Sequence, residues 1–155
     1  MALVGMKIVL TGLDPAAWSL VALQVVLERE GHDVVNLGAL PPVDLVVGAC
    51  RRERPGCLVL SAALGTEGGP VLRRVRADPA LHGLPVVIGG RFTGSRAELL
   101  ALGFDEVFPV GPDGPGQAVV RLRRYLARPR GRRQSRRSTI VALARPPASH
   151  IVCRP

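Results

Sequence analysis

The chain has 155 residues, and its 47% hydrophobic content is enough to fill one ordinary core. Its formal net charge of +9 is confined to one end, because residues 1–126 carry 13 basic and 12 acidic side chains, whereas residues 127–155 carry eight arginines and no acid. This distribution argues against a globular part built for nucleic acid, and no apolar run approaches the roughly 18 residues of a membrane span.

The start of the chain and its cysteines indicate where the protein resides. Residues 1–6 lack the charged start and long apolar stretch of a signal peptide. Cys50, Cys57 and Cys153 have no metal-ligand spacing, and an odd number of cysteines without an export signal favours a reducing compartment. We therefore expect a soluble cytoplasmic protein whose thiols are core or incidental groups.

The first elements follow from apolar runs and helix signals. Residues 7–12 (KIVLTG) predict a buried strand. Asp14 is suited to the N-cap and Pro15 to the first position of a helix from about Pro15 to Glu30, which Gly31 ends. Residues 32–38 (HDVVNLG) predict the second strand.

The rest of the globular part repeats this rhythm of strand and helix. After Pro41 and Pro42 the pattern predicts four helices, three strands and a glycine-rich loop. The helices are expected at 43–54, 71–76, 95–102 and 116–126, the strands at 57–61, 84–88 (closed by Gly89 and Gly90) and 106–109, and the loop at 65–70.

Five apolar strands alternating with five helices predict an α/β fold with a parallel sheet covered on both faces. Right-handed crossovers make it a doubly wound, flavodoxin-like (Rossmann-like) fold. We assign residues 1–126 to this domain. Residues 127–155 begin with ARPRGRRQSRRST, which has no hydrophobic period, and are expected to be a disordered arginine-rich tail.

A ligand site is expected at one edge of this sheet. The loops that follow parallel strands meet at their carboxyl ends, where open α/β sheets bind ligands. The loops at 13–19, 39–42, 62–69, 89–94 and 110–114 should line one crevice there, although turn residues in loops need no ligand to explain them.

Three common ligand classes match this edge poorly. A phosphoacceptor site needs clustered acids after the first strand and an aspartate ending the third, but here a single Asp14 and Ser61 stand at those places. A dinucleotide site needs GxGxxG after the first strand, which TGLDPAAW does not supply, and a Walker loop is also absent.

Taken together, the loops resemble those of the cobalamin-binding domains of carbon-skeleton mutases, and most closely the small subunit of glutamate mutase (methylaspartate mutase). The similarity covers about residues 5–126. In that family a first-loop DxHxxG motif supplies the histidine that replaces the nucleotide base beneath cobalt, while the aspartate holds the imidazole. Other blocks that match are HDVVNLG (32–38), the Ser61 that begins SxL, Gly89 with Gly90, and GFDEVFPVG (103–111).

The first loop departs from the family motif. Residues 14–19 read DPAAWS, so Asp14 is kept, whereas Ala16 stands in place of the histidine and Ser19 in place of the glycine. Ala63 stands in place of the SxL leucine, and Arg91 follows the glycine pair where asparagine is common. Alanine offers cobalt no nitrogen, so a bound cobalamin should keep its own base coordinated or hold water below the metal.

The resemblance implies a cobalamin-binding subunit of an adenosylcobalamin-dependent, glutamate mutase-like isomerase, which alone catalyses nothing and needs a large barrel subunit. The residues expected to face the corrinoid are Leu13, Asp14, Pro15, Ala16, Ala17, Ser61, Ala62, Ala63, Gly89, Gly90, Arg91, Phe92, Thr93 and Gly94. The alternative is a non-catalytic regulatory or interaction module that kept the fold and lost the cofactor. The tail could contact nucleic acid by charge alone, without specificity, or be a dispensable extension.

Two of these residues have a second interpretation. Asp14 could remain only as a helix N-cap rather than orient a ligand, and Ser61 could be a turn residue rather than a cofactor contact.

Overall fold

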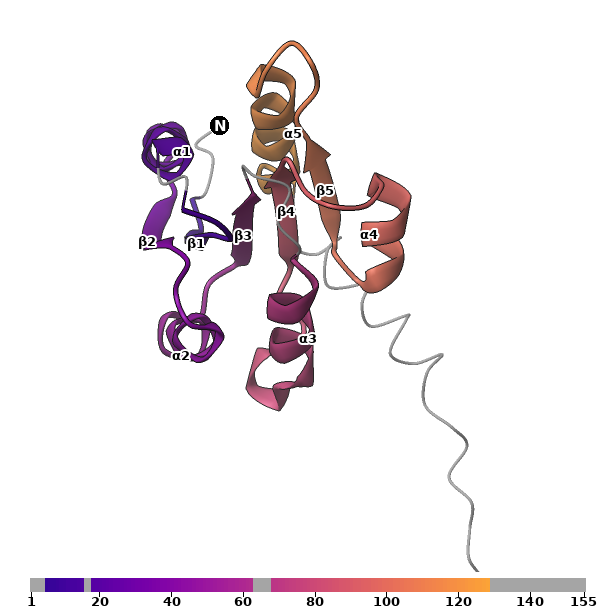
Figure 1. Ribbon diagram of the computed structural model, residues 1–155. Coiled ribbons are helices and arrows are strands. Elements are labelled where there is room, and N and C mark those ends of the chain that lie inside the picture. Colours follow the sequence, from indigo (N-terminus) through magenta and orange to yellow (C-terminus); the bar gives the residue numbers. More distant parts are fainter. Residues whose placement is uncertain (1–4, 16–17, 63–67, 129–155) are drawn as a thin grey trace, which may run out of the picture.

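The computed structural model describes residues 5–15, 18–62 and 68–128. Within these ranges the chain forms a five-stranded sheet in the order β2-β1-β3-β4-β5, and every neighbouring pair of strands is parallel (Figure 1). The predicted doubly wound, flavodoxin-like fold is therefore confirmed. The strands are β1 (Lys7–Gly12), β2 (Asp33–Ala39), β3 (Cys57–Ala62), β4 (Val86–Gly90) and β5 (Glu106–Pro109).

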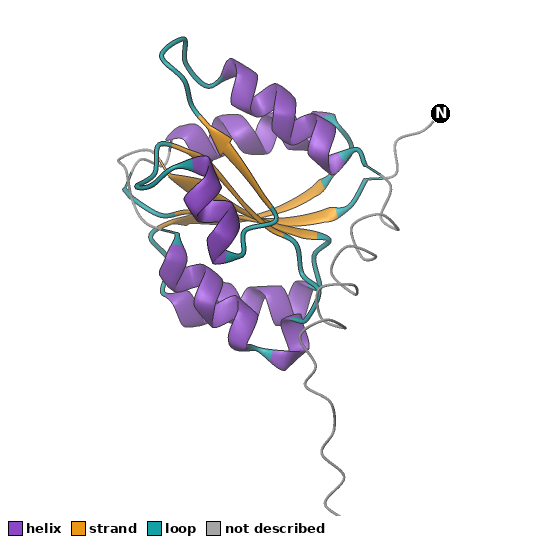
Figure 2. Ribbon diagram, turned by 90° about the vertical axis from the view of Figure 1, so that its right-hand side faces the viewer, coloured by secondary structure: helices purple, strands orange, loops and turns teal. Residues whose placement is uncertain are grey.

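Helices cover both faces of the sheet (Figure 2). Helices α1 (Trp18–Arg29) and α5 (Gly116–Leu126) lie on one face, and α2 (Val43–Glu53) and α3 (Gly69–Ala77) lie on the other. Helix α4 (Arg96–Leu102) packs beside β5, and a short 3₁₀ helix, η1 (Pro79–Leu81), follows α3. None of the helices in the described ranges combines the length and apolar character needed to cross a bilayer.

Each face of the sheet has its own apolar core, because strand side chains alternate between the two faces. Leu10, Val59 and Val87 pack on the α1 and α5 side, together with Leu20 and Leu122. The cluster on the α2 and α3 side is larger, and its members include Val9, Leu60, Ile88, Val47, Leu72 and Phe104. Burial on both faces explains why the strands read as continuous apolar runs in the sequence.

The first helix begins later than predicted. Helix α1 starts at Trp18 rather than near Pro15, so Asp14 lies four positions before its first residue and is not its N-cap. The reason lies in the chain just after β1, which stays beside β3 because the Leu13 N–H donates to the Ser61 carbonyl at 2.9 Å. Asp14 is buried in this turn with 4% of its surface exposed.

Strand β4 is displaced by two residues from its predicted position. It spans Val86–Gly90 rather than 84–88, so Gly89 and Gly90 belong to the strand instead of closing it. Pro85 has no N–H to donate to a sheet, whereas Gly89 and Gly90 pair in register with Ser61 and Ala62.

The other predicted boundaries need smaller corrections. Helix α3 begins at Gly69, within the segment predicted as a glycine-rich loop. Residues 65–67 of that loop, and residues 129–155 of the predicted tail, lie outside the described residues. The predicted strand at 106–109 and the predicted helix at 116–126 are confirmed.

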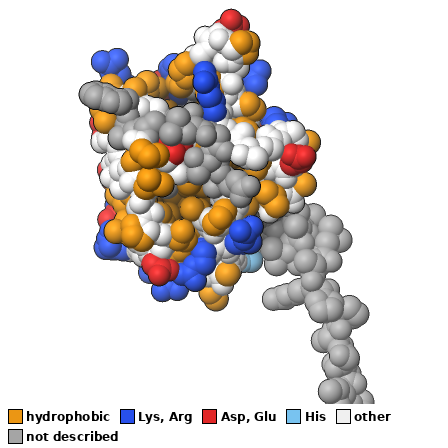
Figure 3. Space-filling model, in the orientation of Figure 1, with side chains coloured by type: hydrophobic (Ala, Val, Ile, Leu, Met, Phe, Trp, Pro, Cys, Tyr) orange, Lys and Arg blue, Asp and Glu red, His pale blue; other side chains and the backbone are white. Residues whose placement is uncertain are grey.

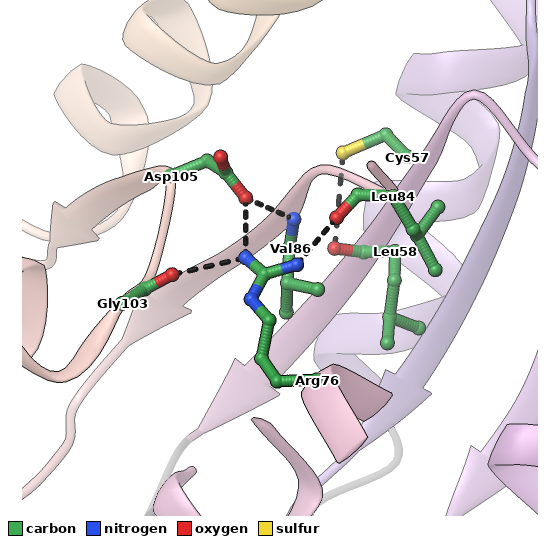
Figure 4. Close-up of polar contacts among 7 residues, drawn as sticks. All are labelled: Cys57, Leu58, Arg76, Leu84, Val86, Gly103 and Asp105. Carbon is green, nitrogen blue, oxygen red and sulfur yellow. Dashed lines mark hydrogen bonds and ion pairs between the residues drawn. The ribbon is translucent and has the colours of Figure 1, made fainter. Parts of the chain in front are cut away.

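Arg76 ties α3 to the entry of β4 and β5 (Figure 4). Its guanidinium donates to the Leu84 carbonyl at 2.7 Å, to the Gly103 carbonyl at 2.9 Å and to the Asp105 carboxylate at 2.7 Å. The same Asp105 oxygen accepts from the Val86 N–H at 2.7 Å. One arginine thus satisfies groups from the two segments that enter β4 and β5 at the amino end of the sheet.

The two cysteines in the described ranges are core thiols, as predicted. Cys50 and Cys57 are both buried and unbonded to one another. The Cys57 thiol lies 3.7 Å from the Leu58 carbonyl (Figure 4), and burial raises the pKa of the Cys50 thiol to about 11. The Cys50 thiol is therefore protonated and unreactive at neutral pH. Cys153 lies outside the described residues.

Candidate functional site

An apolar groove of about 400 Å³ lies between α1 and α5, over the carboxyl ends of β3 and β4. Its floor is formed by strand residues and its two walls by helix residues. The lining consists of Ser19, Ala22, Leu23 and Val26 from α1, Val59 to Ala62 from β3, Gly89, Gly90 and Arg91 from β4 and its end, Phe108 and Val110 from β5 and its end, and Pro115, Ala118, Val119 and Leu122 from α5 and its start. This volume lies in the range typical of small-molecule sites.

The groove exists because two helices cannot cover five strands on this face. Helix α1 packs on β1 and β2, and α5 packs on β5. The two helices stand apart over the same face in Figure 1, which leaves the carboxyl ends of β3 and β4 without a helix above them. The carboxyl ends of the strands are the expected place for a ligand in an open α/β sheet, and the strand order reverses next to this groove, between β1 and β3.

Small side chains hollow the floor of the groove. Gly12, Ser61, Gly89 and Phe108 lie side by side across four strands in register. Three of these four carry a small side chain or none, whereas Val59, two residues earlier on the same face, fills the core. The sheet surface therefore drops at its carboxyl end, and a ligand could approach the backbone there.

Gly90 fixes the shape of the groove where β4 ends. Its φ of +111° lies in a region that favours glycine, and a Cβ at this position would come within 1.8 Å of the Ala62 carbonyl oxygen. The Arg91 N–H donates to that same oxygen at 2.7 Å, and the Val110 N–H donates to the Gly90 carbonyl at 3.0 Å. The backbone that carries Arg91 is thus held firmly against β3 and the end of β5.

The groove is nearly free of charge. Among its described lining residues only Arg91 is ionised, and the other polar side chains are the hydroxyls of Ser19 and Ser61. In the view of Figure 3, hydrophobic side chains reach the surface across the middle of the molecule, and most lysines and arginines lie toward the rim. The arrangement suits a largely apolar ligand that also carries a negative group.

The described residues supply no evident ligand to a metal in the groove. Within those ranges no three histidine, cysteine, aspartate or glutamate side chains gather closely enough to hold a metal ion. His32 lies just before β2, where its Nδ1 accepts from the Met6 N–H at 3.2 Å, and His82 lies between η1 and β4. Both are at the amino edge of the sheet, opposite the groove.

Comparison with known protein families shows to which family this chain belongs. A model described as the B12 binding domain matches residues 8–117, a range that includes all five strands except Lys7 of β1, together with the floor of the groove. The chain belongs to the B12-binding domain family. No curated protein matches it significantly.

Solved structures similar to this B12-binding domain include a cobalamin-binding protein and receiver domains. A cobalamin-binding protein from Desulfitobacterium hafniense DCB-2 is 20% identical, with a TM-score of 0.60, and the match covers 78% of this chain and 59% of that one. The receiver domain of sensor histidine kinase PA1611 from Pseudomonas aeruginosa PAO1 is 19% identical, with a TM-score of 0.59 and coverage of 83% and 99%. The N-terminal receiver domain of Klebsiella pneumoniae RstA is 26% identical, with a TM-score of 0.55 and coverage of 79% and 99%.

These similarities establish the shared fold. The B12-binding domain spans about three fifths of the length of the cobalamin-binding protein that it matches.

The structure brings five of the predicted cofactor-facing residues together in the groove of this B12-binding domain: Ser61, Ala62, Gly89, Gly90 and Arg91. The others in the described ranges lie elsewhere. Leu13 and Phe92 pack with the core cluster on the α2 and α3 side, Asp14 is buried beside β1, and Pro15, Thr93 and Gly94 are exposed. Ala16, Ala17 and Ala63 lie outside the described residues.

The helical walls of the groove were missed by reasoning from the sequence. Ala22, Leu23 and Val26 of α1 and Ala118 and Val119 of α5 line it, although the prediction considered only loops. A signal was present, because α1 is apolar on nearly all sides while only Leu20 and Leu27 of its described side chains are buried. A helix with more apolar residues than the core buries presents an additional apolar face, which indicates contact with a partner or a ligand.

A second hollow of the B12-binding domain lies on the opposite face, between α2 and α3. Its charged side chains are already paired: Arg51 lies 2.5 Å from Asp78, and Arg74 pairs with Asp44. Burial raises the pKa of Asp78, but the hydrogen bonds from Arg51 and the Ala80 N–H outweigh it, and the net pKa is lowered. We interpret this hollow as a structural junction of the two helices.

Proposed function

We propose that this protein binds cobalamin in the groove between α1 and α5 and offers the cobalt no protein nitrogen. The observation that carries the proposal is the groove itself, an apolar slot over β3 and β4 in a member of the B12-binding domain family. In its adenosyl form, the bound cofactor would supply a cobalt to carbon bond that can break homolytically.

The residues of the groove fit the organic part of this cofactor. Ser61 and Gly89 lie side by side at the floor, so a flat ring could approach the strand backbone closely. The walls formed by Ala22 and Val119 are apolar and would exclude water from its faces. We therefore favour the state in which the nucleotide base occupies the groove and water lies below the metal, over the state in which the base stays coordinated.

A titration of the full chain with hydroxocobalamin and with adenosylcobalamin tests this proposal. We expect binding together with an absorbance spectrum that lacks the signature of protein-imidazole coordination. Ala22→Trp should fill the groove and lower the affinity at least about tenfold, which corresponds to ~1.4 kcal/mol. Val21→Trp is the matched control, because Val21 lies on the same helix, is 58% exposed and does not line the groove.

Two results of this titration would contradict the proposal. If the wild-type protein binds neither hydroxocobalamin nor adenosylcobalamin, the proposal that it is a cobalamin-binding protein is wrong. Equal affinity of the Ala22→Trp and Val21→Trp variants would place the corrinoid elsewhere on the protein.

A finer proposal concerns the reaction. We propose that the protein is the cobalamin-binding subunit of a glutamate mutase-like (methylaspartate mutase-like) isomerase, with adenosylcobalamin as the cofactor and a large barrel subunit as the partner. The support is the order of matching blocks, in which β2, the ends of β3 and β4, and the residues around β5 all resemble that subunit. The protein should be inactive alone and should support carbon-skeleton rearrangement only when a large mutase subunit and adenosylcobalamin are added.

The competing function is a regulatory or interaction module without a cofactor. It is favoured by the receiver domains of similar fold, which cover 79% and 83% of this chain in the two cases above. The same titration separates the two functions, because only the cobalamin-binding protein should change the spectrum of hydroxocobalamin.

A further inference from the structure

Arg91 is the single charged side chain among the described residues that line the groove. The other lining residues are apolar, glycine or serine, so the electrostatic character of this site depends on one guanidinium. Arg91 is exposed rather than packed into the core, and it stands at the carboxyl end of β4. Its position in the groove lining distinguishes it from the other exposed arginines of the described ranges.

The backbone of Arg91 is fixed while its charge is left available. Its N–H donates to the Ala62 carbonyl at 2.7 Å, and the preceding Gly90 lies so close to that carbonyl that a Cβ there would come within 1.8 Å of its oxygen. No carboxylate of the described residues pairs with it. By contrast, Arg76 and Arg96 are held by Asp105 and Glu106, at 2.7 Å and 2.5 Å.

We infer that Arg91 is a specificity residue that recognises the phosphodiester in the nucleotide tail of cobalamin. The inference rests on the proposed function and specifies which part of the cofactor this chain recognises. A groove that is apolar along its length and cationic at one end matches a ligand in which an aromatic base is joined to a phosphate. Arginine suits this role because its planar group can donate two parallel hydrogen bonds to phosphate oxygens.

The consequence is selectivity for complete corrinoids. Cobinamide carries the corrin ring and cobalt but lacks the phosphate, ribose and base. A site that holds the corrin ring alone would bind cobalamin and cobinamide alike. A site in which Arg91 binds the phosphate prefers cobalamin, and this preference should weaken as added salt screens the charge.

The test compares hydroxocobalamin and cobinamide binding to full-length wild-type protein and to Arg91→Ala, with Arg91→Lys as an intermediate case. We expect Arg91→Ala to lower the affinity for hydroxocobalamin about tenfold, which is the loss of one charge-assisted contact, and to leave the affinity for cobinamide unchanged. Arg121→Ala is the matched control. Arg121 is exposed on α5, outside the groove lining, and should leave both affinities unchanged.

The outcomes separate this inference from the proposed function. If wild-type protein binds neither corrinoid, both fail. If it binds hydroxocobalamin and Arg91→Ala binds it equally well, cobalamin binding stands and the role of Arg91 is refuted. An equal loss of affinity for hydroxocobalamin and cobinamide would also refute it, because Arg91 would then act on the corrin ring or on the folded structure, which circular dichroism of the variant distinguishes.

Discussion

Gly90→Ala should be among the most damaging single substitutions of a small residue in this protein. A Cβ at Gly90 would stand 1.8 Å from the Ala62 carbonyl oxygen and 2.9 Å from its carbon, so the backbones of β3 and β4 would have to separate. The residue would also be forced to keep a φ of +111°, which costs a residue with a side chain about 1 to 3 kcal/mol.

Separation of these strands also weakens two hydrogen bonds. They join the Arg91 N–H to the Ala62 carbonyl at 2.7 Å and the Val110 N–H to the Gly90 carbonyl at 3.0 Å. Each is worth about 1 kcal/mol. Together with the backbone strain, the expected loss in the free energy of unfolding is about 3 to 5 kcal/mol, which lowers the urea midpoint by roughly 1.5 to 2.5 M at a denaturant slope of about 2 kcal/mol per M.

Gly89→Ala is the control for this measurement. Its Cβ would meet the Phe108 Cβ and carbonyl oxygen at 3.6 Å, which is ordinary van der Waals contact, and its φ is not in the positive region. We expect a change within about 1 kcal/mol. Urea unfolding followed by far-ultraviolet circular dichroism compares both variants with the wild type. A Gly90→Ala midpoint equal to that of Gly89→Ala would refute the argument that the Ala62 carbonyl leaves no room for a side chain.

Three further predictions concern stability and the extent of the folded domain. Arg76→Met should lower the free energy of unfolding by about 2 kcal/mol, because it removes the donor of two carbonyls and the cationic partner of Asp105; an unchanged urea midpoint would contradict this. The hydrogen bond and charge of Lys7 lower the pKa of Glu53, so the pair stabilises the fold above the unfolded carboxyl pKa of about 4, and this contribution is lost as the pH falls from that value through the lower pKa of the folded state. Urea midpoints between pH 7 and pH 3 should therefore fall less steeply in Glu53→Gln. Deletion of residues 129–155 should leave both the urea midpoint and the cobalamin affinity unchanged, since α5 ends at Leu126; a loss of either would give the tail a role in the domain.

The sheet could be predicted from the sequence because each of its strands is determined by residues that are close together in the chain. The strands 7–12, 57–62 and 106–109 are short apolar runs between turn residues, and each alternates with a helical pattern. Parallel pairing follows from that alternation, since each crossover helix returns the chain to the same edge. The gathering of Ser61 and Gly89 at one edge follows as well.

The features that were not predicted depend on contacts between distant segments. The late start of α1 follows from the hydrogen bond of the Leu13 N–H to Ser61, which no pattern near Asp14 reveals. The extension of β4 through Gly90 depends on its neighbours in β3 and β5, which pair with glycines as readily as with larger residues. The groove depends on the distance between α1 and α5. These helices are almost ninety residues apart in the sequence, so no local sequence pattern predicts that distance.

The lost histidine can be tested directly by restoring it. Ala16→His combined with Ser19→Gly would place an imidazole in the first loop at the position that the mutase motif uses and would remove a side chain from the start of α1. Ser19 lines the groove and is exposed, so the glycine opens space there; Ala16 lies outside the described residues. We expect a higher affinity for hydroxocobalamin and an absorbance spectrum shifted to protein-imidazole coordination, because a histidine nitrogen is a strong donor to cobalt.

The first control for this experiment is Ser19→Gly alone, which should leave the spectrum as in the wild type. The second adds Asp14→Asn to the double variant. If Asp14 orients the new imidazole, as the aspartate does in the family motif, the variant with Asp14→Asn should bind hydroxocobalamin about tenfold more weakly than the double variant. If the double variant gains neither affinity nor a shifted spectrum, the missing histidine is not what distinguishes this groove from that of a mutase subunit, and the difference lies in its walls.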